Sequence, residues 1–336
     1  MLTLIFTLRA AVIPMMLPLF LPHAAPGRGR LPAPMAPGPV QEGLRNEALQ
    51  AALTAALAGK TAQLEDLLSR FGGHGTRPNL RLAAAFGAEV SALPGTVAAL
   101  LDRLGANDAA PDQPQVFLPV AAAHGWVGRL RAKREVGTAW DALALLAGDE
   151  RSPVRIGTLD ALTSFATRPG GADALVARAG DWLELDDREI SFGSAGVVVE
   201  VFASRQTLAA LSRPEALLDY LARAIEAVVG ASRAAERSDA RRRLLLALPR
   251  TVAAAVVAFG ERGAAWLEEV CQSARHPDLR TALSNTILAL SDKASGQGAA
   301  LSQRLRSALE GSAKPPRDPT RRRPGAGRGK STRPMR

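Results

Sequence analysis

The sequence predicts an all-α fold, an α-solenoid of stacked antiparallel helix pairs. Alanine and leucine dominate the composition, aromatic residues make up only 4%, and runs of β-branched residues are few, which favours helix over sheet. Two segments also superpose, because Asp149–Ala166 and Ala274–Leu290 each read as a turn with a proline followed by a helix. A repeated turn and helix is typical of an array of helix pairs.

The first predicted helices occupy residues 46–104. Gly59 breaks an Ala/Leu-rich segment and Gly72-Gly73 ends it, because glycine adopts the positive φ of a helix C-cap without strain. Pro94-Gly95 divides residues 80–104 into two short helices. Residues 105–114 form a loop, which is the clearest internal boundary, although one short loop does not establish two domains.

From Gln115 onward the pattern predicts one further helix and then helix pairs. Ser152 is the expected N-cap of the helix in 149–166. Asp186 is expected to cap the helix at 187–203, with Glu189 three positions later as in a capping box. The predicted helices are 115–133, 135–147, 149–166, 172–185, 187–203, 214–230, 238–259, 261–274 and 277–290.

Corresponding positions give the repeat length. Val154, Ile190, Leu244 and Leu279 lie 36, 54 and 35 residues apart, a mean of roughly 42 that matches the period of two-helix repeats. The interval of 54 requires an insertion, which we place at 231–237.

Two stretches resemble HEAT and related armadillo-type repeats, namely D-E-R-S-P-V-R-I-G-T-L-D-A-L at Asp149–Leu162 and H-P-D-L-R-T-A-L at His276–Leu283. Such repeats carry an acidic residue or proline in the turn and then an apolar residue with an arginine. The resemblance implies that Arg155 and Arg280 are structural and bond to a neighbouring turn. The apolar residue followed by an arginine is missing in D-R-E-I before Ser191 and near Ser238. The repeat boundaries at these two places therefore stay open.

The net charge of +10 belongs to the ends of the chain. Residues 314–336 carry +8 and residues 1–45 carry +3, which leaves −1 for the rest. Residues 312–336 are rich in Pro, Gly and Arg and nearly devoid of apolar side chains, so we expect a disordered basic tail. The candidate anion or nucleic-acid contacts are the two arginine runs, Arg241, Arg242 and Arg243, and Arg321, Arg322 and Arg323.

Residues 1–39 are expected to lie outside the folded part, 40–311. Arg9, the apolar run 10–21 and the small residues at 23–25 resemble a signal peptide, but Pro14 and Pro18 argue against a spanning helix. In the alternative interpretation Met35 is the true start and the preceding residues are an upstream extension. Both interpretations remain open.

The reactive residue types show no catalytic or metal-binding spacing. Cys271 is the single cysteine, so no intramolecular disulfide can form and a reducing compartment is expected. The four histidines lack metal-ligand spacing. We therefore expect no cofactor and no enzymatic activity.

The sequence supports two hypotheses about function. The first is a non-enzymatic, monomeric, cytoplasmic scaffold or adaptor that binds a protein partner along its surface and has no membrane contact. The alternative is a nucleic-acid-binding protein to which the basic tail adds non-specific phosphate contacts. A variant resembles HEAT-like DNA alkylation-repair glycosylases, which need an aromatic, an acid and an arginine in one groove. No residue of that family can be carried over, but four tryptophans are available: Trp126, Trp140, Trp182 and Trp266.

Overall fold

The chain folds into helices only, as far as it is described. A computed structural model describes residues 39–73, 77–293 and 297–312, and no strand occurs among them. The predicted all-α class is therefore confirmed. The chain divides into two units, Met1–Glu42 and Gly43–Arg336, and the hydrophobic core lies in the second unit. The loop after Gly105 does not divide this unit.

The helices occur in the predicted order along the chain. The first seven are α1 (Pro39–Leu57), α2 (Ala62–Gly72), α3 (Leu80–Ala92), α4 (Ala98–Gly105), α5 (Phe117–Arg131), α6 (Val136–Gly148) and α7 (Ser152–Ala166). The others are α8 (Gly171–Trp182), α9 (Arg188–Val201), α10 (Arg205–Ala209), α11 (Pro214–Val229), α12 (Asp239–Phe259), α13 (Glu261–Ser273), α14 (Pro277–Lys293) and α15 (Gln297–Gly311). Two 3₁₀ turns precede α5 and α12, at Pro114–Val116 and Ala235–Arg237.

Two predicted helix caps are wrong by a residue or more. Ser152 is the first residue of α7 and makes no cap; the preceding turn is held by Asp149, whose Oδ1 accepts from the Arg151 N–H at 2.7 Å. Asp187, rather than Asp186, caps α9, because its backbone is extended and its Oδ1 accepts from the Glu189 N–H at 2.9 Å.

Two helices have no counterpart in the predicted order. The short helix α10, capped by Ser204, lies inside the 54-residue interval, so the insertion there comprises α10 as well as the loop after α11. The last helix, α15, packs on α13 and α14. Ser312, which the sequence assigns to the tail, is buried there and its Oγ donates to the Ala274 carbonyl at 3.0 Å.

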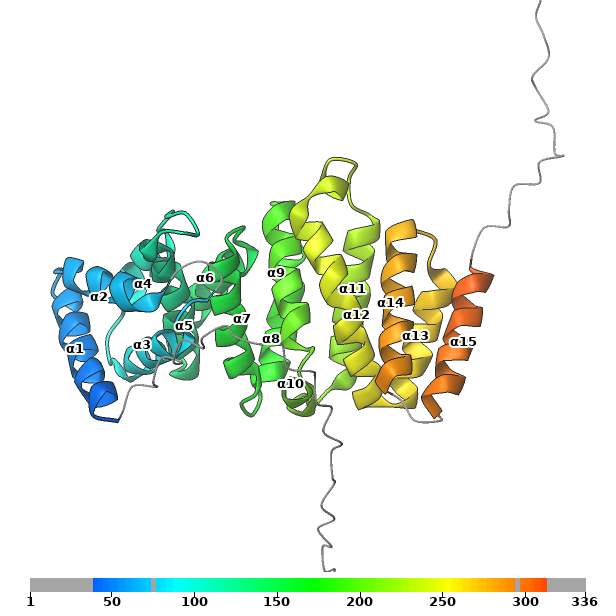
Figure 1. Ribbon diagram of the computed structural model, residues 1–336, viewed down its shortest axis with the longest axis horizontal. Coiled ribbons are helices and arrows are strands. Elements are labelled where there is room, and N and C mark those ends of the chain that lie inside the picture. Colours follow the sequence, from blue (N-terminus) through cyan, green and yellow to red (C-terminus); the bar gives the residue numbers. More distant parts are fainter. Residues whose placement is uncertain (1–38, 74–76, 294–296, 313–336) are drawn as a thin grey trace, which may run out of the picture. The chain divides into compact units, whose positions relative to one another are not determined.

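Successive helices pack on one another in two rows (Figure 1). In the first row α3, α5, α7, α9, α12 and α14 each contact the next. In the second row α4 contacts α6, α8 contacts α11, α11 contacts α13, and α13 contacts α15. Each element therefore packs mainly on elements close to it in the chain.

Many long-range polar contacts join residues from 33 positions apart, as in Arg131–Ser164, to 47 positions apart, as in Arg262–Glu215. Five of them join residues that are 39 positions apart: Gln50–Glu89, Arg129–Val90, Thr96–Glu135, Ser212–Asp173 and Arg223–Glu184. Separations of this size are comparable to the period of roughly 42 that the sequence predicts for helix pairs.

Glycines allow neighbouring helices to approach closely, both within the first row and between the two rows. A Cβ at Gly128 of α5 would lie 2.3 Å from the carbonyl oxygen of Gly87 in α3, and a Cβ at Gly193 of α9 would lie 2.9 Å from the Cα of Gly148 in α6. Neither position admits a side chain without a backbone shift. The small residues around Gly193 thus serve helix packing, as their position on a buried face predicts.

Candidate functional site: an arginine surface along α7

The run of three arginines at the start of α12 separates into three different environments. Consecutive helix residues point about 100° apart, and here only one of them is buried. Arg241 is 3% exposed; its Nε donates to the Val228 carbonyl at 3.1 Å and its Nη1 lies 2.9 Å from Asp278 Oδ2. Its side chain is enclosed and its charge is paired, although its Nη2 has no hydrogen-bond partner in the described part of the chain. A contact of Arg241 with an anion or nucleic acid stays a prediction that this burial disfavours.

Arg242 and Arg243 remain accessible on different sides of α12. The Arg242 side chain is 69% exposed and pairs with Asp239 one turn earlier, at 3.0 Å. Arg243 is half-buried beside α7 and α9, and its Nε has no hydrogen-bond partner in the described part of the chain. Of the run, Arg243 therefore has the most unused hydrogen-bonding capacity. Arg321, Arg322 and Arg323 lie outside the described residues, as do residues 1–38 of the predicted leader and the tail beyond Ser312, whereas Pro39 is the first residue of α1.

A second basic cluster, at the end of α5, consists of Arg129, Arg131, Lys133 and Arg134, and its arginines also differ in their environments. Arg129 is buried in α5, whereas Arg131, two residues later, reaches α7 and its Nη2 donates to Ser164 Oγ at 2.5 Å. Burial, followed by repulsion from Arg168, lowers the pKa of Arg131. One arginine from each cluster, Arg131 and Arg243, thus lies beside α7.

Five arginines lie along α7 and its neighbours, and we call them the arginine surface: Arg131, Arg155, Arg168, Arg243 and Arg250. None of them forms an ion pair of 4.0 Å or less with a carboxylate among residues 46–73, 77–291 and 298–312. Carboxylates also lie beside these arginines: Asp160 and Glu200, Asp149 near Arg155, and Asp108, Glu150 and Glu189 around a second hollow that Arg243 lines. The surface is therefore mixed in charge, and its distinguishing feature is that its arginines are not in close ion pairs within the same residue ranges.

A hollow of about 160 Å³ opens in this surface between α7, α9 and α12. Its charged lining is Arg155, Glu200 and Arg243, and the other lining residues are Ser152, Ile156, Leu159, Gly193, Gly196 and Val197. Burial, followed by repulsion from Arg243, lowers the pKa of Arg155. Burial raises the pKa of Glu200, while Arg155 and Arg250 act in the opposite direction.

The two turn arginines bond to backbone carbonyls. Arg155 Nη1 donates to the Asp149 carbonyl at 2.9 Å, within its own turn. Arg280 Nη1 donates to the carbonyl of Leu309 in α15 at 2.7 Å. The resemblance assigns both residues to structure, but Arg155 also lines the hollow, so it belongs to both the turn and the candidate site.

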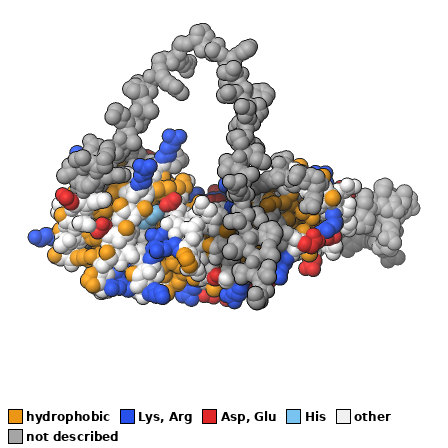
Figure 2. Space-filling view, turned by 90° about the horizontal axis from the view of Figure 1, so that it is seen from below, with side chains coloured by type: hydrophobic (Ala, Val, Ile, Leu, Met, Phe, Trp, Pro, Cys, Tyr) orange, Lys and Arg blue, Asp and Glu red, His pale blue; other side chains and the backbone are white. Residues whose placement is uncertain are grey.

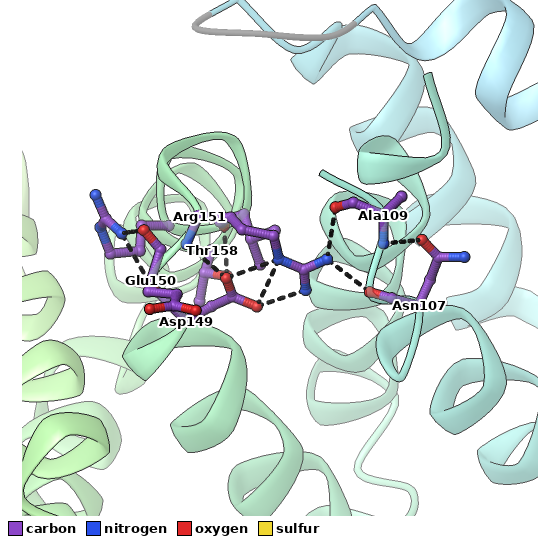
Figure 3. A network of polar contacts seen from close by, with 8 residues as sticks. Asn107, Ala109, Asp149, Glu150, Arg151 and Thr158 are labelled. Atoms are coloured by element: carbon purple, nitrogen blue, oxygen red, sulfur yellow. Dashed lines mark hydrogen bonds and ion pairs between the residues drawn. The ribbon is translucent and has the colours of Figure 1, made fainter. Parts of the chain in front are cut away.

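A neighbouring polar network fixes the turn between α6 and α7 (Figure 3). Arg151 extends across to the preceding loop, where its Nη1 donates to the carbonyls of Asn107 at 2.7 Å and Ala109 at 3.1 Å. Its Nη2 lies 2.6 Å from Asp149 Oδ2. The guanidinium is thereby committed to holding this turn, which carries α7 and with it Arg155.

His124 of α5 lies buried beside the arginine surface. Its Nε2 has no hydrogen bond and is 3.6 Å from Asp160 Oδ2. Burial, and secondarily the charge of Arg131, lowers the pKa of His124 to about 4. The imidazole is therefore neutral at physiological pH. Burial likewise raises the pKa of Asp160.

The four tryptophans serve the hydrophobic core. Trp126, Trp140 and Trp182 are 1%, 7% and 2% exposed, and Trp266 packs against the core from a half-buried position. Trp140 makes edge contacts with Phe165 and Trp182, at centroid distances of 5.4 Å and 6.1 Å. Trp126, Trp140 and Trp182 are therefore too enclosed to stack on an extruded base, and only Trp266 is partly exposed.

The hollow is the feature that sequence reasoning missed. Arg243 and Arg250 are seven positions apart on one helix, two turns that share a face, and this signal was available. The partners from other helices, Arg155 and Glu200, could not be assigned to the same place without the packing of α7 and α9 on α12.

The face shown in Figure 2 has basic, acidic and apolar side chains interspersed. Within the described residues, no group of three or more His, Cys, Asp and Glu could hold a metal ion, and no helix is long and apolar enough to cross a membrane. Cys271 is buried, and burial raises its pKa to about 11. Comparison with protein-family models and with curated proteins gives no match to this chain.

Proposed function

We propose that the chain is a non-enzymatic helical-repeat scaffold that binds a protein partner along the first row of helices. The observation that carries the proposal is the arginine surface, where Arg155 and Arg243 have no carboxylate partner. The five polar contacts that span 39 positions support a stack of helix pairs, and such stacks present extended binding surfaces. A reducing compartment and a monomeric state belong to the same proposal.

Apolar side chains next to the arginines support a protein partner. Leu246 is 71% exposed on α12, three residues after Arg243, and Val257 is 61% exposed on the same side of that helix. Leu288 on the neighbouring α14 is 55% exposed. Protein interfaces combine arginines with large apolar residues in this way.

The test is a pull-down with the immobilised full-length chain and two single variants. Arg243→Ala removes a cation of the arginine surface. Arg178→Ala removes a partly exposed arginine of α8, in the second row, as the control. We expect a partner that wild type and Arg178→Ala recover and that Arg243→Ala loses. Recovery of no protein above background, or equal recovery by all three proteins, would count against the proposal.

Nucleic-acid binding remains a second candidate, because one arginine from each basic cluster, Arg131 and Arg243, lies beside α7. Neutralising several phosphates makes affinity fall steeply with salt between about 50 and 200 mM. The discriminating measurement is a duplex DNA titration over that range with the full chain and with a variant ending at Gly311. Equal binding by the two proteins would assign the DNA contact to the helical part. Binding by neither protein would exclude the nucleic-acid function and leave protein binding as the remaining proposal.

A further inference from the structure

The hollow between α7, α9 and α12 has room for a small charged group. Its volume is about 160 Å³, whereas a water molecule occupies roughly 30 Å³ of the liquid. The helix α7 lines it with Arg155 and α12 with Arg243, while α9 contributes Gly193, Gly196, Val197 and Glu200. The two arginines therefore border the same space from different helices.

The hollow contains arginine N–H donors that have no hydrogen-bond acceptor in the described part of the chain. Arg155 uses Nη1 for turn carbonyls and makes no other side-chain hydrogen bond among the described residues. Arg243 Nε is buried without an acceptor. A buried N–H that has no partner is costly, and an anion that accepts from it would remove that cost. The N-terminus of α7, at Ser152, adds a favourable dipole.

The surroundings favour a carboxylate over a phosphodiester. Ile156, Leu159 and Val197 form the apolar part of the lining. An acidic side chain followed by an apolar one fits both the arginines and this apolar lining, because a guanidinium pairs with a carboxylate in a bidentate manner and the apolar neighbour contacts these apolar side chains. A nucleic-acid backbone offers no apolar group to this site.

Glu200 competes for the same cations from within the chain. Its carboxylate interacts electrostatically with Arg155 and Arg250 but is in an ion pair of 4.0 Å or less with neither. An external carboxylate must therefore enter beside an existing negative charge. Removing that charge is expected to strengthen anion binding.

We propose that this hollow is a subsite for the side-chain carboxylate of an acidic-apolar segment in a protein partner, held by Arg155 and Arg243. This inference deepens the proposed function and rests on it, since it states the chemistry of the partner. It makes Arg155 a residue with two roles, one in its turn and one in recognition.

The experiment observes the arginine Nε–H resonances of the ¹⁵N-labelled full-length chain by NMR. The probe is glutamate capped at both backbone ends, added at constant ionic strength, with capped glutamine as the uncharged match and inorganic phosphate as the second anion. We expect a saturable shift of the Arg243 resonance with capped glutamate in the millimolar range, none with capped glutamine, and a weaker response to phosphate. Glu200→Gln should tighten capped-glutamate binding several-fold. The Arg243 resonance is identified by its loss in Arg243→Lys.

The Arg178 resonance is the internal control, because that side chain lies on α8 and already pairs with carboxylates. A non-saturable shift shared by Arg178 and Arg243, or no shift of Arg243, would overturn the carboxylate subsite. A tighter response to phosphate than to capped glutamate would overturn it in favour of a phosphorylated ligand. These outcomes are distinguishable from those of the pull-down. A partner that Arg243→Ala fails to recover, together with no NMR shift, would support the scaffold function and contradict the carboxylate subsite. An NMR shift together with no recovered partner would support the subsite and contradict the scaffold function.

Discussion

The environment of Arg129 and the hollow at Arg243 are two arginine-rich regions that use the same side chain differently. Arg129 is 1% exposed; its Nη1 and Nη2 donate to the carbonyls of Leu93 at 2.9 Å and Gly95 at 2.7 Å, and its Nε pairs with Glu135. In the hollow, by contrast, Arg243 leaves its Nε without an acceptor.

Glu135 completes the first region. Its Oε1 accepts from the backbone N–H groups of Val97 at 3.0 Å and Ala98 at 3.2 Å, so a side chain from the start of α6 satisfies the N-terminus of α4. Burial opposes ionisation, but hydrogen bonds from Thr96 and Arg129 prevail and lower the pKa of Glu135. The residue adopts φ of +48° to reach this position.

The difference teaches that an arginine with all its donors satisfied supports the fold, whereas one with unsatisfied donors at an accessible site is available for a ligand. Substitutions around Arg129 should lower the stability of the fold and leave ligand binding unchanged. Substitution of Arg243 in the hollow should weaken ligand binding and leave stability nearly unchanged.

The largest effect is expected for Arg129→Met. This substitution leaves the Glu135 carboxylate without its cation in a partly buried place, and we expect the free energy of unfolding to fall by about 3–5 kcal/mol. Chemical denaturation followed by circular dichroism measures it. The matched control is Arg178→Met in a largely exposed pair, where the expected loss is below about 1 kcal/mol. Similar losses in the two variants would contradict the claim that the buried Arg129 stabilises the fold more than Arg178 does.

Arg241→Met tests the intermediate case. The side chain is as buried as Arg129, but its carboxylate partner, Asp278, is 50% exposed and keeps its hydration when the arginine is removed. We expect a loss of about 2–3 kcal/mol by denaturation, from the hydrogen bonds to carbonyls. A loss equal to that of Arg129→Met would show that exposure of the carboxylate is irrelevant.

His124 extends the comparison to a buried base. Since its folded pKa, about 4, lies below the unfolded value near 6.5, the unfolded state binds more protons and stability falls as pH decreases through this interval. The expected loss is about 2 kcal/mol between pH 7.5 and 5. Asp160, whose pKa burial raises, acts in the opposite sense nearer its own pKa. Denaturation at the two pH values should show a flatter dependence in His124→Gln, and an unchanged dependence would contradict the assignment.

The smallest stability effect is expected for Arg243→Ala. Because Arg243 makes no hydrogen bond or ion pair within the described chain, we expect its free energy of unfolding to stay within about 0.5 kcal/mol of wild type. The measurement is the same denaturation experiment used for Arg129→Met. A loss above about 2 kcal/mol would place Arg243 with the structural arginines and remove it from the candidate site.

The sequence by itself determined the helical class and most helix positions. Local signals suffice for these, since proline and glycine mark helix ends and the apolar stripe of α7 follows a helical period. The similarity of two turns was visible for the same reason, because they carry similar residues at Val154 and Leu279. Membership of the HEAT or armadillo type stays a prediction that rests on those turns.

Only the tertiary structure decided which charged residues are available. Arg241, Arg242 and Arg243 look alike in the sequence, but α12 turns by about 100° per residue and is covered on one side, so neighbours enter different environments. The hollow adds Arg155 and Glu200 from helices that are distant in the chain. Since burial and the positions of partners decide whether a guanidinium is satisfied, this assignment depends on helix packing that no local pattern contains.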